Sequence, residues 1–164
     1  MSQKTYDLAP LLKKLEAPKG PVDVVLDTDT ANEVDDQFAL AYLLASTENF
    51  RVKAIYAAPF FNENSTGPAD GMQKSYEEIL KLLELAQLSH YKEVVFQGSP
   101  DYLPNETTPV RSPAAEDLAK RALDYSPENP LYVVAIGALT NIASALLLEP
   151  SIADKIVLVW LGGN

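Results

Sequence analysis

The chain has 164 residues, and 47% of them are hydrophobic, which is enough to bury the core of one globular domain. Its formal net charge of −10 at pH 7 argues against a nucleic acid or an anionic membrane surface as the partner, and favours a cation or a neutral small molecule. Because the chain has no cysteine, disulfide bonds and thiolate metal sites are excluded, and a metal would need oxygen ligands or the single histidine, His90.

The first twenty residues carry charges scattered among apolar side chains. We expect residues 1–20 to form an N-terminal arm with a short helix from Leu8 to about Leu15, followed by one domain over residues 21–164. No apolar run in the chain is as long as a membrane span, and this predicts a cytoplasmic protein.

The residues after this arm alternate between strand patterns and helix patterns. β-Branched residues over 21–26 predict a buried strand, which ends where several aspartates begin, and a strongly apolar helix is predicted over 35–48. The proline-rich residues 98–113 predict a loop. The same alternation predicts further strands over 52–58, 94–97, 131–136 and 156–160, and further helices over 70–88, 114–125 and 140–148.

This order of elements predicts the α/β class, with a Rossmann-like parallel sheet that has helices on both faces. In such sheets ligands bind beyond the carboxyl ends of the strands. We therefore expect Asp27, Asp29, Asn62 and residues 137–141 to meet at one cleft. The last strand, with Trp160 predicted to be buried, is typical of the middle of a sheet. This predicts that the fold is truncated here or is completed by another chain.

Four aspartates lie at the junction of the first strand and the following helix. Asp27 and Asp29 share one face if the strand continues, and Asp35 and Asp36 open the helix, whose exposed N–H groups favour carboxylates. Together they offer a hard cation such as calcium or magnesium several oxygen ligands. The alternative is that one acid only caps the helix and the others are solvated, but four acids in one turn then repel each other without a counterion.

Two other motif families fit these residues less well. An EF-hand loop needs a central glycine and a late glutamate, and both are missing at the required offsets after Asp27. The stretch VVLDTDT also resembles the first motif of haloacid-dehalogenase-type phosphatases, in which Asp27 would be the nucleophile beside magnesium. That family usually has a glycine where Thr30 and Ala31 stand, and a later acidic pair that this chain lacks. A magnesium-dependent phosphatase and a non-catalytic metal-binding or sugar-binding half-domain stay as alternatives.

Three separated motifs, LDTDTANEVDD, AIYAAPFFN and VVAIGALTNIASAL, resemble the inosine-uridine-preferring nucleoside hydrolases. This resemblance covers nearly the whole chain in order. It implies a nucleoside hydrolase-like fold and the calcium-dependent hydrolysis of the N-glycosidic bond of purine or pyrimidine ribonucleosides, which gives free base and ribose. The implied partners are a nucleoside or ribosyl substrate and either a second copy of the chain or a complementary C-terminal half.

The resemblance also implies a metal site with three ligands from this chain. Asp29 would be both a calcium ligand and the catalytic general base on the attacking water, and Asp36 would be a bidentate ligand. Thr140 would contribute its backbone carbonyl, and its side chain is expected to cap the helix that begins there.

Other residues would bind the substrate or support the cluster. Asp35 would accept a hydrogen bond from the ribose 2′ hydroxyl, Asn62 would be a substrate-binding residue of the pocket, and Asp27 would support the cluster. Tyr42 and Tyr56 are expected in the core rather than stacked on a nucleobase, and His90 is given no role.

The chain departs from the family pattern in two ways. The loop over residues 30–34 is two residues longer than the common family loop, which usually carries Pro-Gly. Members of the family are roughly twice as long, and their second half carries another aspartate ligand, further ribose contacts and often a histidine acid. We therefore expect this chain to be an N-terminal portion of a divergent member that lacks part of the active site.

Overall fold

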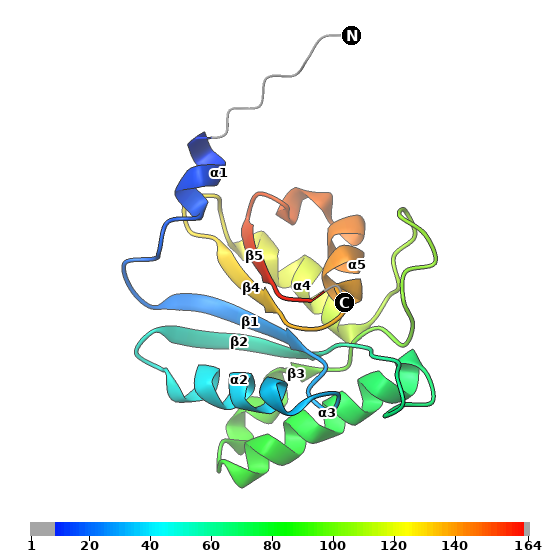
Figure 1. Ribbon diagram of the computed structural model, residues 1–164. Helices are drawn as coiled ribbons and strands as arrows, with labels where there is room; N and C mark the ends of the chain where they lie inside the picture. The colour runs from blue at the N-terminus through cyan, green and yellow to red at the C-terminus, as the bar shows by residue number, and fades with distance from the viewer. Residues whose placement is uncertain (1–8, 163–164) are drawn as a thin grey trace.

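The computed structural model describes residues 9–162, which form a five-stranded parallel sheet with the strand order β3-β2-β1-β4-β5 (Figure 1). The strands are β1 Val22–Thr28, β2 Phe50–Ala57, β3 Val95–Phe96, β4 Leu131–Ala135 and β5 Ile156–Trp160. The α-helices are α1 Ala9–Lys14, α2 Val34–Ala45, α3 Pro68–Leu85, α4 Pro113–Arg121 and α5 Thr140–Leu148. Short 3₁₀ helices lie at Ser89–Val94, Ala122–Asp124 and Pro150–Ile152.

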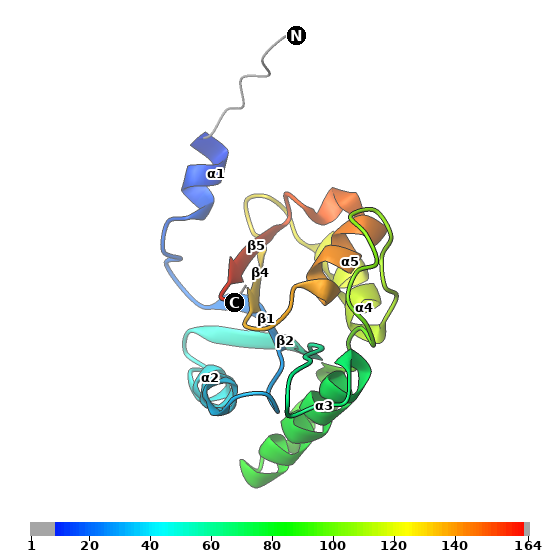
Figure 2. The ribbon, with the colours of Figure 1, turned by 45° about the vertical axis from the view of Figure 1, so that its right-hand side comes forward.

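Helices cover both faces of the sheet, with α2 and α3 on one side and α4 and α5 on the other (Figures 1 and 2). Successive residues of a strand point to opposite faces, so Val24 and Val25 belong to different cores. Val24 packs in the core that contains Leu40 of α2, and Val25 packs in the core that contains Leu118 of α4. The predicted α/β fold is therefore confirmed.

The strand register brings the segments that follow β1, β2 and β4 to the same end of the sheet, beyond the carboxyl ends of these strands. Asp27 of β1 lies opposite Tyr56 of β2 and Ala135 of β4. Just beyond, the Ala58 N–H donates to the Thr28 carbonyl at 2.8 Å. The strands β1, β2 and β4 therefore end at the same level, and the residues that follow them can form one site.

One prediction about the end of the chain is wrong, namely that Trp160 is buried. In the part of the chain that the structure describes, β5 lies at the edge of the sheet, where it pairs with β4 alone. Trp160 is accordingly 47% exposed instead of buried.

The prediction for the tyrosines is half right. Tyr42 was expected in the core but is 69% exposed on the outer side of α2, while Tyr56 is buried as predicted.

The N-terminal helix matches the sequence prediction over Ala9–Lys14, while Leu8 and the residues before it lie outside the described range. The division of the chain after residue 20 stays a prediction. Among residues 9–162, no helix has both the length and the apolar character needed to cross a membrane.

Candidate active site

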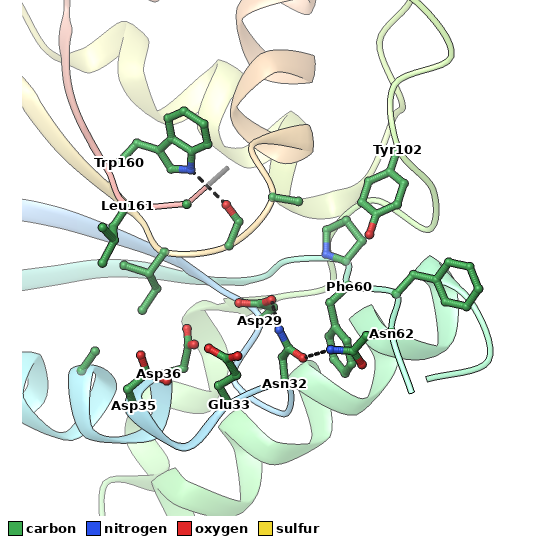
Figure 3. A pocket seen from close by; sticks show the side chains of 17 residues that line it. Asp29, Asn32, Glu33, Asp35, Asp36, Phe60, Asn62, Tyr102, Trp160 and Leu161 are labelled. Carbon is green, nitrogen blue, oxygen red and sulfur yellow. Dashed lines mark hydrogen bonds between the residues drawn. The ribbon is translucent and has the colours of Figure 1, made fainter. Parts of the chain in front are cut away.

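A pocket of about 710 Å³ opens beyond the carboxyl ends of the strands (Figure 3). It is lined by the β1–α2 turn, the loop after β2, the end of β5 and the β4–α5 turn. The polar lining residues are Asp29, Asn32, Glu33, Asp35, Asp36, Asn62 and Tyr102. Three of the four aspartates and the asparagine singled out from the sequence therefore meet here.

Asp29 is held by a hydrogen bond from a neighbour in the same turn. The Asn32 side-chain amide donates to Asp29 Oδ2 at 3.0 Å. Burial raises the pKa of Asp29, and the nearby carboxylates of Glu33 and Asp35 raise it further. A side chain at Gly137 would place its Cβ 2.8 Å from Asp29 Oδ1, so the glycine makes room for this carboxylate.

Asp36 lies in the first turn of α2 and is buried, whereas Asp35 beside it is exposed. The Thr28 hydroxyl donates to Asp36 Oδ1. Burial raises the pKa of Asp36 to about 6, and repulsion from Asp29 adds to the shift. Neither aspartate is the N-cap, which is Glu33 and makes no side-chain cap hydrogen bond. The interpretation of these acids as simple helix caps is therefore wrong.

Asp27 lies beneath the pocket and does not line it. It is fully buried, and its Oδ1 accepts a hydrogen bond from Asn141 Nδ2 at 2.8 Å. Its Oδ2 has no hydrogen-bond partner among the described residues. Burial raises the pKa of Asp27 to about 7. The carbonyl oxygen of the Asn141 amide accepts from the Ser99 N–H at 2.7 Å, so the amide ties Asp27 to the loop after β3.

Asn62, in the segment after β2, lines the pocket and joins an asparagine network. Its Nδ2 donates to Asn32 Oδ1 at 2.6 Å, and its Oδ1 accepts from the Asn64 N–H at 2.9 Å. Sequence reasoning missed Asn32. The signal that could have found it is the unusual length of the loop in which it lies.

Thr140, like Asp27, is a predicted site residue that does not line the pocket. It is the first residue of α5, and the N-cap is Leu139 without a side-chain cap bond, so the predicted capping role is wrong. The Ala143 N–H donates to the Leu139 carbonyl at 2.9 Å, which starts the helix one residue earlier than a Thr140 cap would. Gly137 and Ala138 of the same turn do line the pocket.

Aromatic side chains form the outer wall of the pocket, and sequence reasoning missed this role too. Phe61 follows β2, Tyr102 comes from the proline-rich loop, and Trp160 ends β5. The Trp160 indole N–H donates to the Gly137 carbonyl at 3.1 Å. The path of an irregular loop leaves no periodic pattern in the sequence, so the position of Tyr102 could not be read from it.

Two of the predicted metal ligands, Asp29 and Asp36, lie in the same pocket. Asp29 and Asp36 face one pocket with raised pKa values, and repulsion between them is a cost that a cation would remove. Within residues 9–162, however, no three acidic or histidine side chains are grouped closely enough to hold an ion. The chain therefore presents two carboxylate ligands and needs further oxygen donors to complete a shell.

The motifs and the geometry agree with a comparison against known families. A family model, the inosine-uridine preferring nucleoside hydrolase, matches residues 24–164. The chain belongs to this family. The nucleoside hydrolase resemblance is confirmed, and the phosphatase and the non-catalytic half-domain have no support in the comparisons. No curated protein matches the chain.

Solved structures share the nucleoside hydrolase fold. A plant nucleoside hydrolase, the PpNRh1 enzyme, is 25% identical with a TM-score of 0.59, over 88% of this chain and 48% of that one. The purine-preferring ribonucleoside hydrolase from Gardnerella vaginalis is 23% identical with a TM-score of 0.63, over 87% and 49%. The type III effector XopQ, solved with adenosine diphosphate ribose, is 19% identical with a TM-score of 0.64, over 94% and 48%. This chain thus spans about half the length of these proteins.

Proposed function

We propose that this chain forms the N-terminal part of the active site of a ribonucleoside hydrolase. The reaction would cleave the N-glycosidic bond of a purine or pyrimidine ribonucleoside and give free base and ribose. One observation carries the proposal: Asp29, Asp35, Asp36 and Asn62 line the same pocket in a chain of the nucleoside hydrolase family. The cytoplasmic location inferred from the sequence stays a prediction.

The carboxylates would act on water and on the sugar. Burial raises the pKa of Asp29, which makes it a better proton acceptor near neutral pH than a solvated aspartate, so it suits the general base on the attacking water. Cleavage passes through an oxocarbenium-like sugar, and the negative charge of Asp29 and Asp36 would stabilise the positive charge that develops there. Asp35 would accept a hydrogen bond from the ribose 2′ hydroxyl, and Asn62 would bind the substrate from the segment after β2.

Calcium dependence is part of the proposal. Asp29 and Asp36 would hold the ion, and the Thr140 carbonyl is proposed as a third ligand because neighbouring residues of its turn line the pocket. When bound, the ion would polarise a water molecule and the ribose hydroxyls. Asp27, buried below with one unpartnered oxygen, would support the cluster.

The chain also offers an apolar surface that suits a complementary C-terminal half. Val34, Phe38 and Tyr42 of α2 are 64%, 71% and 69% exposed, and Val159 and Leu161 at the end of β5 are 50% and 76% exposed. A helix that is apolar on its outer side as well belongs in an interior. Because the similar structures are about twice as long, we propose that a polypeptide equivalent to their other half covers this surface.

Release of free ribose tests the proposal. The chain, together with a polypeptide that supplies the complementary half, is incubated with inosine and uridine, with calcium or with a chelator, and ribose is measured as reducing sugar. We expect calcium-dependent release that falls at least 100-fold in Asp29→Asn, since a positioned general base contributes about that much or more. The control is Asp101→Asn in the exposed loop after β3. A chain that binds neither calcium nor a ribonucleoside would contradict the proposal.

A further inference from the structure

Asn32 occupies a central place in the pocket wall, although it belongs to an irregular turn. It lies between β1 and α2, in the loop that is two residues longer than usual in the family. Figure 3 shows its side chain between Asp29 and Asn62. The neighbouring Glu33 is exposed and makes no cap hydrogen bond, whereas Asn32 bonds both to Asp29 and to the segment after β2.

Four hydrogen bonds fix the position of Asn32. Its N–H donates to the Asp29 carbonyl at 2.7 Å, and its Nδ2 donates to Asp29 Oδ2 at 3.0 Å. Its Oδ1 accepts from Asn62 Nδ2 at 2.6 Å, and its carbonyl accepts from Asn64 Nδ2 at 3.4 Å. The amide thus uses its donor side for Asp29 and its acceptor side for Asn62, so a rotation of this group would break both contacts.

This arrangement gives the two oxygens of Asp29 different surroundings. Oδ2 accepts the Asn32 hydrogen bond, while Oδ1 points toward Gly137, where a Cβ would come within 2.8 Å. One oxygen of Asp29 is therefore held by the protein, and the Asn32 hydrogen bond fixes the orientation of the carboxylate plane. Outer partners of this kind orient a carboxylate before it binds a metal or accepts a proton.

We infer that Asn32 is a positioning residue for Asp29 and that it couples Asn62, in the segment after β2, to this carboxylate. The inference rests on the proposed function, because Asp29 is there the base and metal ligand. The inference also explains why the loop is long, since Asn32 must reach both Asp29 and the segment after β2. Loss of such an outer partner typically lowers metal affinity 10-fold to 100-fold.

The first test uses the metal-free chain and depends only on the contact. In a ¹H–¹⁵N spectrum, the side-chain amide pair of Asn32 is the one that disappears in Asn32→Ala. We expect this pair to shift in Asp29→Ala and in Asn62→Ala, and to stay in place in Asn105→Ala, whose asparagine bonds only within its own exposed loop. A pair that is unmoved by Asp29→Ala overturns the inference whether or not the chain binds calcium.

The second test is a double-mutant cycle on calcium affinity, measured by calorimetry with Asn105→Ala as the control. We expect Asn32→Ala to weaken binding about 10-fold or more and Asn62→Ala to weaken it less. Because Asn62 acts through Asn32, the double variant should match Asn32→Ala within about twofold. Independent, multiplying effects of the two substitutions would overturn the coupling. If the wild-type chain binds no calcium, the calcium proposal fails, and the spectra alone decide whether Asn32 positions Asp29.

Discussion

At the scale of single residues, Asp27 determines how the chain should respond to pH. It is fully buried with a pKa of about 7, and Asp36 has a pKa of about 6, both above the value of 3.8 for a solvated aspartate. Between pH 4 and pH 7 the folded chain therefore holds protons that the unfolded chain has lost. Stability should be greatest at the acidic end and should fall as pH rises through these folded-state values.

The corresponding prediction concerns Asp27→Asn in the metal-free chain. For the wild type, the free energy of unfolding should fall with rising pH over this window, by up to about 1.4 kcal/mol per pH unit for each group. The variant keeps an uncharged side chain at every pH, so its slope should be smaller near pH 6 to 7. Urea unfolding at several pH values measures both slopes, and equal slopes would contradict the assignment.

A second prediction concerns the room beside Asp29. In Gly137→Ala the new Cβ would lie 2.8 Å from Asp29 Oδ1 and 3.2 Å from the Ala58 Cβ, so the carboxylate must move. We expect calcium affinity to fall about 10-fold or more, as for other losses of ligand orientation. Gly20→Ala is the matched control, because nothing lies within 4 Å of its added Cβ. Equal affinities in the two variants, by calorimetry, would show that Asp29 is not constrained from this side.

The aspartates of the pocket could be predicted from the sequence because regular elements place them. Asp29 follows a strand and Asp35 and Asp36 open a helix, so the strand end and the helix start were enough to bring them together. Asn32 and Tyr102 come from irregular loops, whose backbone path depends on tertiary contacts rather than on periodicity. These two side chains could be found only in the structure.

At the scale of elements, α2 combines a core face with an uncovered face. Leu40, Leu43 and Leu44 pack against the sheet, while Phe38 and Tyr42 are exposed. We predict that the isolated chain self-associates through this surface as concentration rises, and that Phe38→Lys with Tyr42→Lys removes the association. The change in unfolding free energy should be small, because exposed positions rarely contribute more than about 0.5 kcal/mol. Light scattering that finds a monomeric wild type at all concentrations would contradict this.

The start of α4 gives a separate prediction about stability. The Ser112 hydroxyl accepts a hydrogen bond from the Ala115 N–H at 3.2 Å and is the N-cap of this helix. Ser112→Ala should lower the free energy of unfolding by about 1 kcal/mol, the usual cost of losing a cap. Ser89→Ala, at an exposed position, serves as the control. Equal midpoints in urea for the two variants would contradict the capping role.

The order of the elements along the chain could be predicted, but the order of the strands in the sheet could not. Hydrophobic patterns identified all five strands and their helices. They carry no information on which strand lies beside which, because pairing is decided by tertiary packing. The strand β5 reads as an interior strand from its apolar residues, yet in the described residues it lies at the edge, and Trp160 is exposed for this reason.

At the scale of the whole molecule, metal binding should appear as added stability. A ligand that binds only the folded state raises the free energy of unfolding by about 2.7 kcal/mol at a concentration 100 times its dissociation constant. We predict that calcium raises the melting temperature of the chelator-treated chain, and that Asp29→Ala with Asp36→Ala abolishes the increase. An equal increase in this double variant would place calcium elsewhere. Scanning calorimetry with and without calcium makes the comparison.

The central claim is that the carboxylates at the end of β1 and the start of α2 form a cation site for a nucleoside hydrolase. The most direct test is a calorimetric titration of the chelator-treated chain with calcium, with the wild type beside Asp36→Ala and with circular dichroism to confirm that both are folded. We predict saturable binding by the wild type that the substitution abolishes. The absence of binding by the folded wild type, or binding that Asp36→Ala leaves unchanged, would contradict the claim.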